Sequence, residues 1–262
     1  MIDSIIIHGS LAKFLKGENV SNISHLQVKE AIWKLEKETG ISFEEAIIKS
    51  IEYGVSFITK ETPAEYLKLF GYPARYIRHE YATITGVETV TYSTQSGSYQ
   101  FTGYNKVLEV QRKKKQNIPA LFEGLNVLRL EYKITRRRGM QAKFHRDLTA
   151  YDLFNPIIYK KLQNFFVETY QAIPKFGWQS DITKLEKITP KQWFYLLAEQ
   201  YRQTFPKEYL YYLKVLKESG ALTEKSLERI RAANREMGRK YSLAEKSLLI
   251  EELDGLVMGR TE

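Results

Sequence analysis

Residues 126–138 read Asn-Val-Leu-Arg-Leu-Glu-Tyr-Lys-Ile-Thr-Arg-Arg-Arg, and this stretch decides the fold that we expect. Successive side chains of a β-strand point to opposite faces of its sheet. One face here is apolar: Leu128, Leu130, Tyr132 and Ile134. The other face is polar: Arg129, Glu131, Lys133 and Thr135. The alternation predicts a half-buried strand with a carboxylate between two cations, a pattern that suits a solvated sheet surface as well as a functional site.

Two further segments have the pattern or the composition of strands. In residues 48–58 the apolar and aromatic side chains alternate with polar ones, and Glu52 falls on the polar side. Residues 76–110 are rich in Thr, Val and Tyr, with glycines at the expected turns. Together with the stretch quoted above, these segments predict an antiparallel sheet.

Helical patterns precede and follow these strands. Apolar residues at helical intervals between Ser24 and Gly40 predict a helix before the sheet. After Gly139 the pattern is helical almost to the C-terminus. We therefore predict an α+β fold, with a nuclease-like antiparallel β-sheet domain and flanking helices in residues 1–145, and an all-helical region in residues 146–262.

The composition favours a polyanionic partner. The 262 residues include 40 Lys and Arg against 31 Asp and Glu, a formal net charge of +9, which favours nucleic acid over a membrane. No segment reaches the roughly 20 apolar residues of a membrane-spanning helix. The chain has no cysteine, which excludes disulfides and thiolate metal sites. We expect a cytoplasmic protein that binds DNA.

Two basic clusters flank the strand that was quoted first. The earlier cluster is Arg112, Lys113, Lys114 and Lys115, and the later one is Arg136, Arg137 and Arg138. Clusters of this kind are often only solvated loops, and phosphate contact is the functional alternative in a chain this basic. We predict that both clusters bind DNA.

Several enzyme classes leave no motif in the sequence. There is no phosphate-binding Gly-x-x-x-x-Gly-Lys, no Gly-x-Ser-x-Gly, and no histidine pair at metal-ligating spacing. On neighbouring polar faces, Glu52 and Glu131 would hold a hard divalent cation, Mg²⁺ or Mn²⁺, through oxygen ligands. Such an ion withdraws charge from a phosphate, so that a tyrosine oxygen can attack the phosphorus, and Lys106 would stabilise the developing charge.

Three short motifs occur in an order and at spacings that resemble a known family. They are His-Gly-Ser-Leu-Ala-Lys-Phe at residues 8–14, Gly-Tyr-Asn-Lys-Val-Leu-Glu at residues 103–109, and Asn-Val-Leu-Arg-Leu-Glu-Tyr-Lys at residues 126–133. Over about residues 1–173 the chain resembles the rolling-circle replication initiators of phages and plasmids, of the filamentous-phage type and with Bacteroidetes-like members. The resemblance implies an endonuclease that nicks one strand at an origin, holds the 5′ phosphate on a tyrosine and rejoins the strand.

The resemblance also implies roles for individual residues. By motif match, Glu131 is a metal-site carboxylate, and Arg129, Tyr104 and Lys106 are its neighbours in the active site. Where relatives show Arg-Ile-Asp before a glycine, this chain has Ser50-Ile51-Glu52. The carboxylate is kept and the arginine is lost.

No motif assigns the nucleophile. Tyr159, which precedes two lysines on a predicted helix, is the first choice by context. Its rivals are Tyr104, Tyr151 and Tyr170.

The alternative functions are a non-catalytic DNA-binding protein on the same scaffold, such as a repressor or packaging factor, and an RNA-binding or structural module. An initiator would act on single-stranded or supercoiled origin DNA. The sequence leaves open whether a second copy of the chain or host replication proteins also bind.

Overall fold

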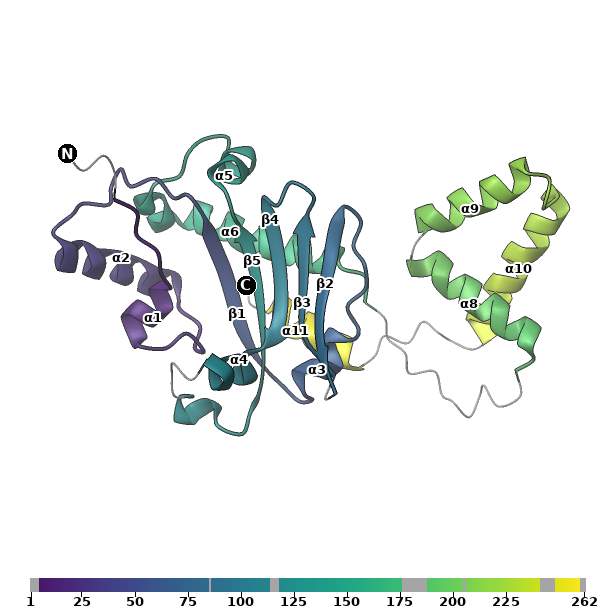
Figure 1. Ribbon diagram of the computed structural model, residues 1–262, viewed down its shortest axis with the longest axis horizontal. Helices are drawn as coiled ribbons and strands as arrows, with labels where there is room; N and C mark the ends of the chain where they lie inside the picture. Colours follow the sequence, from purple (N-terminus) through teal and green to yellow (C-terminus); the bar gives the residue numbers. More distant parts are fainter. Residues whose placement is uncertain are drawn as a thin grey trace. The chain divides into compact units, whose positions relative to one another are not determined.

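The computed structural model describes residues 5–84, 86–113, 118–175, 188–204, 206–240 and 248–259. The described chain divides into two compact units, which we call the sheet unit (Met1–Pro174 with Glu252–Glu262) and the helical unit (Lys175–Glu251). The fold is α+β, with an antiparallel sheet, flanking helices and a helical C-terminal region (Figure 1), which confirms the predicted fold class. None of the described helices combines the length and the hydropathy that crossing a membrane requires.

Among the described residues, five antiparallel strands form one sheet in the order β1-β5-β4-β3-β2. They are β1 (Ile51–Thr59), β2 (Tyr76–Thr83), β3 (Gly86–Thr94), β4 (Tyr99–Asn105) and β5 (Asn126–Ile134). Residues 126–134 of the stretch quoted first form β5, which lies between the edge strand β1 and β4. The two strands that carry Glu52 and Glu131 are therefore hydrogen-bonded neighbours.

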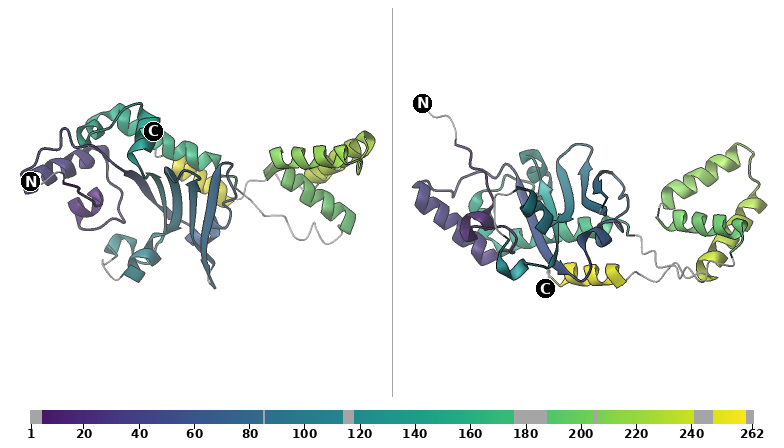
Figure 2. Two further views of the ribbon diagram at one scale, coloured as in Figure 1. Left: turned by 45° about the horizontal axis from the view of Figure 1, so that its top comes forward. Right: turned by 60° about the horizontal axis from the view of Figure 1, so that its bottom comes forward.

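The apolar face of the sheet forms the core. The apolar residues of β5 are at most 2% exposed: Leu128, Leu130, Tyr132 and Ile134. Two helices, α3 (Pro63–Leu67) and α6 (Pro156–Ala172), pack on this face (Figure 2). Every fourth residue of α6 is buried, Ile158, Leu162, Phe166 and Tyr170, because residues at this spacing share one side of a helix.

The sheet unit extends past residue 145, where the sequence-based division placed the end of the sheet domain. The Phe166 ring on α6 lies 5.5 Å from the ring of Tyr53 and 5.7 Å from that of Phe101, so this helix belongs to the core of the sheet unit. Composition alone assigns α6 to the helical region, because its sequence is helical whichever surface it covers.

The chain returns to the sheet unit at its C-terminal end. In α11 (Leu248–Met258), the carboxylate of Glu252 accepts hydrogen bonds from the Tyr66 hydroxyl at 2.9 Å and from the backbone N–H of Lys60 at 3.0 Å. The Tyr170 hydroxyl donates to Asp254 at 2.7 Å. The helical unit is thus inserted between two segments of the sheet unit.

The remaining helices of the sheet unit precede β1 or connect the later strands. They are α1 (Leu11–Lys16), α2 (His25–Thr39), α4 (Lys106–Lys113), α5 (Arg137–Phe144) and the short η1 (Ala120–Phe122) and η2 (Ala150–Phe154). The strand predicted up to residue 110 ends at Asn105, and α4 follows it. The prediction of a strand there was wrong, because Val110 packs in a small cluster with Val20, Phe122 and Val127.

The helical unit contains α8 (Pro190–Thr204), α9 (Pro206–Glu218) and α10 (Glu224–Lys240). Its small core includes Tyr209, Leu213 and Leu227, with Leu222 packed against them. The Asn234 side chain is fully buried beside Tyr209 and hydrogen-bonds to its hydroxyl at 2.9 Å.

Candidate active site

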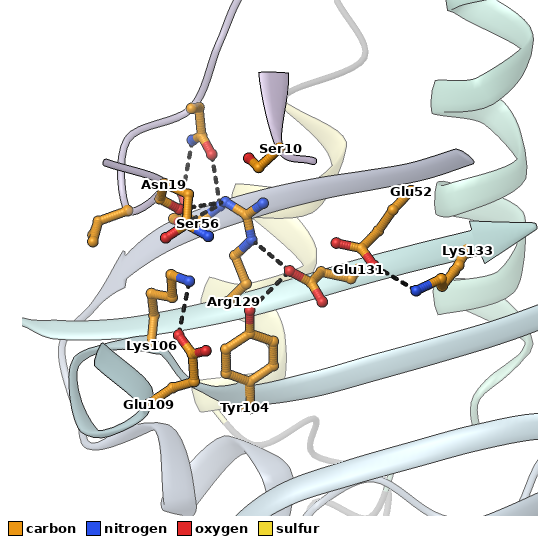
Figure 3. Close-up of polar contacts among 12 residues, drawn as sticks. Ser10, Asn19, Glu52, Ser56, Tyr104, Lys106, Glu109, Arg129, Glu131 and Lys133 are labelled. Atoms are coloured by element: carbon orange, nitrogen blue, oxygen red, sulfur yellow. Dashed lines mark hydrogen bonds and ion pairs between the residues drawn. The ribbon is translucent and has the colours of Figure 1, made fainter. Parts of the chain in front are cut away.

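The strand register brings four of the predicted site residues together on the polar face: Glu52, Tyr104, Arg129 and Glu131. Gly54 pairs with Glu131 across β1 and β5, and Arg129 pairs with Tyr104 across β5 and β4. Glu52 precedes Gly54 by two residues and is diagonal to Glu131, a relation of roughly 7–8 Å that long side chains can span. Figure 3 shows the carboxylates of Glu52 and Glu131 side by side on this face.

Glu131 is the centre of the cluster. Its Oε1 atom accepts a hydrogen bond from the Tyr104 hydroxyl at 2.8 Å and another from Arg129 Nε at 3.0 Å. Within the described ranges, no residue donates to Oε2. One oxygen of the carboxylate is therefore fixed by the protein, while the other can accept a proton or bind a cation.

Arg129 is held in place on three sides. Besides its bond to Glu131, its Nη1 atom donates to the Ser56 hydroxyl at 3.1 Å and to the backbone oxygen of Asn19 at 3.4 Å. A Cβ atom at Gly54 would lie 2.5 Å from Arg129 Nη2. The glycine thus provides the space in which the guanidinium lies over β1.

Lys106 is a buried cation next to the tyrosine. It is 1% exposed, its Nζ atom donates to Glu109 at 2.9 Å, and it lies 5.6 Å from the centre of the Tyr104 ring. Burial lowers the pKa of Lys106, although the neighbouring Glu109 carboxylate opposes this effect. Lys106 thus lies beside the Tyr104 ring, with the Glu109 carboxylate as its partner.

Burial and negative charge perturb the titratable groups of the cluster. Burial, and then the charge of Glu131, raise the pKa of Tyr104 far above its ordinary value. The same two causes raise the pKa of Glu52, whose carboxylate pairs with Lys133 at 3.4 Å. Tyr104 is therefore a neutral phenol at neutral pH, and Glu52 and Glu131 repel each other.

The carboxylate pair suits a hard divalent cation. No group of three or more His, Cys, Asp or Glu residues that could hold a metal ion is found in the part of the chain that the structure describes. Mg²⁺, however, usually keeps several waters and is bound by one or two carboxylates together with substrate phosphates. Glu52 and Glu131 provide that number of carboxylates, and a cation would relieve their repulsion.

The loop before α2 closes one side of the cluster. The side-chain amide of Asn22 donates to the backbone oxygen of Ser56 at 2.9 Å and accepts from its backbone N–H at 2.7 Å. This pairing gives hydrogen-bond partners to the backbone N–H and C=O of Ser56 at the outer edge of β1. Next to it, Val20 packs with Val127 in the small hydrophobic cluster, so a polar-face position of β5 is covered by apolar side chains there.

The sequence did not single out Asn19, Asn22, Gly54 or Ser56. A glycine inside a strand often marks the close approach of another group, so the sequence did indicate the close approach of a side chain or backbone to Gly54. The asparagines act through a loop conformation that the sequence pattern does not specify.

The structure does not bring Tyr159 to this cluster. Its ring stacks on His25 with centroids 4.6 Å apart and lies 5.9 Å from the ring of Tyr53, whose side chain belongs to the apolar face. Burial raises the pKa of Tyr159 to about 12. Of the other rivals, Tyr170 donates to Asp254 and Tyr151 donates to Glu36. Tyr104 is the one nucleophile candidate from the sequence that lies beside Glu131.

The basic side chains of the two clusters differ in ion pairing and in exposure to solvent. Arg112 forms an ion pair with Glu88, Lys113 is the last residue of α4, and Lys114 and Lys115 lie outside the described residues. In the second cluster, Arg136 and Arg138 are exposed, and Arg137 pairs with Asp147 at 2.5 Å.

A family comparison covers the sheet and the cluster. Residues 2–151 match the family model for the N-terminal region of a phage replication-associated protein. The match includes all five strands and the residues of the cluster, whereas Tyr159 lies beyond its end. No curated protein matches the chain.

Proposed function

This chain belongs to the family of phage replication-associated proteins that initiate rolling-circle replication, and from that premise we propose that it nicks and rejoins one DNA strand through a covalent phosphotyrosine. An initiator role implies DNA binding. The observation that supports the proposed chemistry is the hydrogen bond from the Tyr104 hydroxyl to Glu131 on the polar face of the sheet.

In the proposed step Tyr104 is the nucleophile and Glu131 the general base. Because its pKa is raised, the phenol must lose its proton as it attacks, and the carboxylate 2.8 Å away can accept that proton. The Tyr104 oxygen forms a bond to phosphorus while the bond from phosphorus to the 3′ oxygen breaks. The 3′ oxygen takes up a proton from solvent, and the 5′ phosphate stays on Tyr104. Rejoining is the reverse reaction.

Arg129 and Lys106 stabilise the negative charge that develops on the phosphate oxygens. Both cations are nearly enclosed by protein, with exposed fractions of 9% and 1%. Charges that are fixed before the reaction and shielded from water stabilise a transition state without reorganisation. Arg129 also orients the carboxylate of Glu131 through its Nε bond.

Glu52 and Glu131 would hold a Mg²⁺ or Mn²⁺ ion in this proposal. When bound, the ion supplies a Lewis acid that withdraws charge from the scissile phosphate. Support comes from the unshared Oε2 atom of Glu131 and from the raised pKa of Glu52. Lys133, which now pairs with Glu52, neutralises part of the charge at the edge of the site.

A denaturing gel tests the proposal. A single-stranded oligonucleotide spanning the origin is labelled at its 3′ end, so that the fragment attached to protein carries the label. With Mg²⁺ or Mn²⁺, the wild type should form a labelled protein band, Tyr104→Phe should form none, and Tyr159→Phe should behave like the wild type. An adduct in Tyr104→Phe would refute the assignment. Binding by the wild type without any adduct would favour the non-catalytic DNA-binding protein instead.

A further inference from the structure

The polar face continues beyond the candidate active site onto β3 and β2, where the proposed chemistry uses no residue. One row of cross-strand partners runs through Glu131, Thr102, Thr91 and His79. The next row runs through Arg129, Tyr104, Thr89 and Tyr81. Paired side chains point to the same face, so both rows lead from the cluster to the edge strand β2. We call the part of this face on β4, β3 and β2 the hydroxyl track.

Side chains of the hydroxyl track are accessible, unlike those on the reverse of the same strands. On the apolar face of β3, Val90 and Tyr92 are fully buried. On the track, Thr89 and Thr91 are half-buried and His79 is exposed, and Tyr81 is 56% exposed. Short hydroxyl side chains therefore separate the Tyr104 ring from an exposed ring at the sheet edge.

A bulge and a cation fix the surroundings of Tyr81. The register of β2 and β3 shifts between Tyr81 and Ala82, and Glu88 is left without a partner strand residue. Glu88 instead pairs with Arg112 from α4, whose guanidinium lies 5.8 Å from the centre of the Tyr81 ring. Bulges at sheet edges redirect side chains and recur next to functional sites.

This combination matches the chemistry of a single nucleic-acid strand. Exposed rings provide stacking surfaces for unpaired bases, and nearby arginines attract the backbone. Threonine hydroxyls can donate to and accept from base edges and phosphates. A duplex has no free base face to offer to a tyrosine. From Glu131 on β5 to Tyr81 on β2 the polar face spans three strand spacings of about 4.8 Å each, which is room for a few nucleotides.

We propose that a single strand of DNA lies across the hydroxyl track, that Tyr81 stacks on one of its bases, and that the strand reaches the phosphate-transfer site at Tyr104. The inference rests on the proposed function for what happens at Tyr104, while stacking on Tyr81 requires no chemistry. Tyr81 is a binding residue here, not a nucleophile.

The test measures the binding of a labelled oligothymidylate by fluorescence anisotropy, with divalent cations removed so that no cleavage occurs. Base stacking on an aromatic side chain is worth roughly 1–3 kcal/mol, so Tyr81→Ala should weaken binding about 5- to 150-fold. Tyr81→Phe keeps the ring and should bind as the wild type does. The matched control is Tyr72→Ala, because Tyr72 is also 56% exposed but packs against Arg78, whose partner Tyr92 belongs to the apolar face. This control should bind normally.

Wild-type affinity in Tyr81→Ala would overturn the proposal, as would equal competition by a duplex of matched length. The two proposals fail separately. If Tyr104→Phe abolishes the adduct but Tyr81→Ala binds normally, only the hydroxyl track is refuted. If no variant or wild type forms an adduct but Tyr81→Ala binds weakly, the track is supported and the phosphotyrosine mechanism is refuted. Loss of the adduct in Tyr81→Phe would show a chemical role and would also overturn the assignment of Tyr81 to stacking.

Discussion

Gly54→Ala should disable the site while leaving the fold nearly intact. The added Cβ atom would lie 2.5 Å from Arg129 Nη2 and 3.0 Å from its Cζ and Nε atoms, whereas favourable contacts between such atoms lie at roughly 3.5–4.0 Å. The guanidinium must therefore move by about 1 Å. It can do so because it is the end of a flexible side chain, but it then loses its alignment with Ser56 and Glu131.

The size of the effect follows from these contacts. Overpacking of this kind costs roughly 1–3 kcal/mol of stability. A misplacement of about 1 Å at a reacting centre costs on the order of 100-fold in rate, which corresponds to about 2.7 kcal/mol of transition-state stabilisation. We expect nicking to fall about 100-fold at a temperature where Gly54→Ala is still folded.

The assay follows the conversion of supercoiled origin DNA to open circles, with thermal unfolding measured on the same samples. The matched control is Gly255→Ala, because Gly255 lies in α11 and has no atom within 4 Å of an added Cβ. If the loss acts through Arg129, then Gly54→Ala should have no further effect in an Arg129→Ala background. Wild-type nicking by folded Gly54→Ala would show that the space at Gly54 is not needed for the position of Arg129, and additive losses in the double variant would show the same.

The charges and hydrogen bonds support three further predictions. The folded-state pKa of Glu52 is raised, so the protonated carboxyl group of Glu52 adds to the free energy of unfolding at low pH. This contribution is lost as the pH rises through the folded-state pKa. Metal-free Glu52→Gln should therefore melt no lower than the wild type at pH 7, and Mg²⁺ should raise the melting temperature of the wild type but not of the variant. Tyr170→Phe removes the donor to Asp254 and should cost roughly 1–3 kcal/mol in urea unfolding. Replacing Arg136 and Arg138 with alanine should reduce the slope of log affinity against log salt for single-stranded DNA by about 1.4.

The sequence predicted the faces of the strands well. Alternation with a period of two places Glu131 and Glu52 on polar faces wherever their strands pair, because a strand with one buried face has little freedom of register. The sequence did not predict that β1 and β5 are neighbours in the sheet. Strand order depends on contacts between distant segments, and the sequence pattern alone contained no signal for it.

The wrong strand prediction and the arrangements that the sequence left open concern segments whose environment lies elsewhere in the chain. The apolar pattern of residues 106–113 is too short to distinguish a strand from a helix. The segment is helical in the structure, where Val110 packs against Val20. The helix that carries Tyr159 was predicted, but nothing in its sequence states which face of the sheet it covers. The space left by Gly54 for Arg129 depends likewise on the pairing of two strands.

The most direct test of the proposed phosphotyrosine mechanism is mass spectrometry of the wild-type protein after reaction with origin DNA, nuclease trimming and trypsin digestion. The tryptic peptide of residues 79–106 contains Tyr81, Tyr92, Tyr99 and Tyr104, so fragmentation must locate the nucleotide within it. We expect a phosphodiester-linked nucleotide on Tyr104. A nucleotide on Tyr159, or on any tyrosine other than Tyr104, would contradict it.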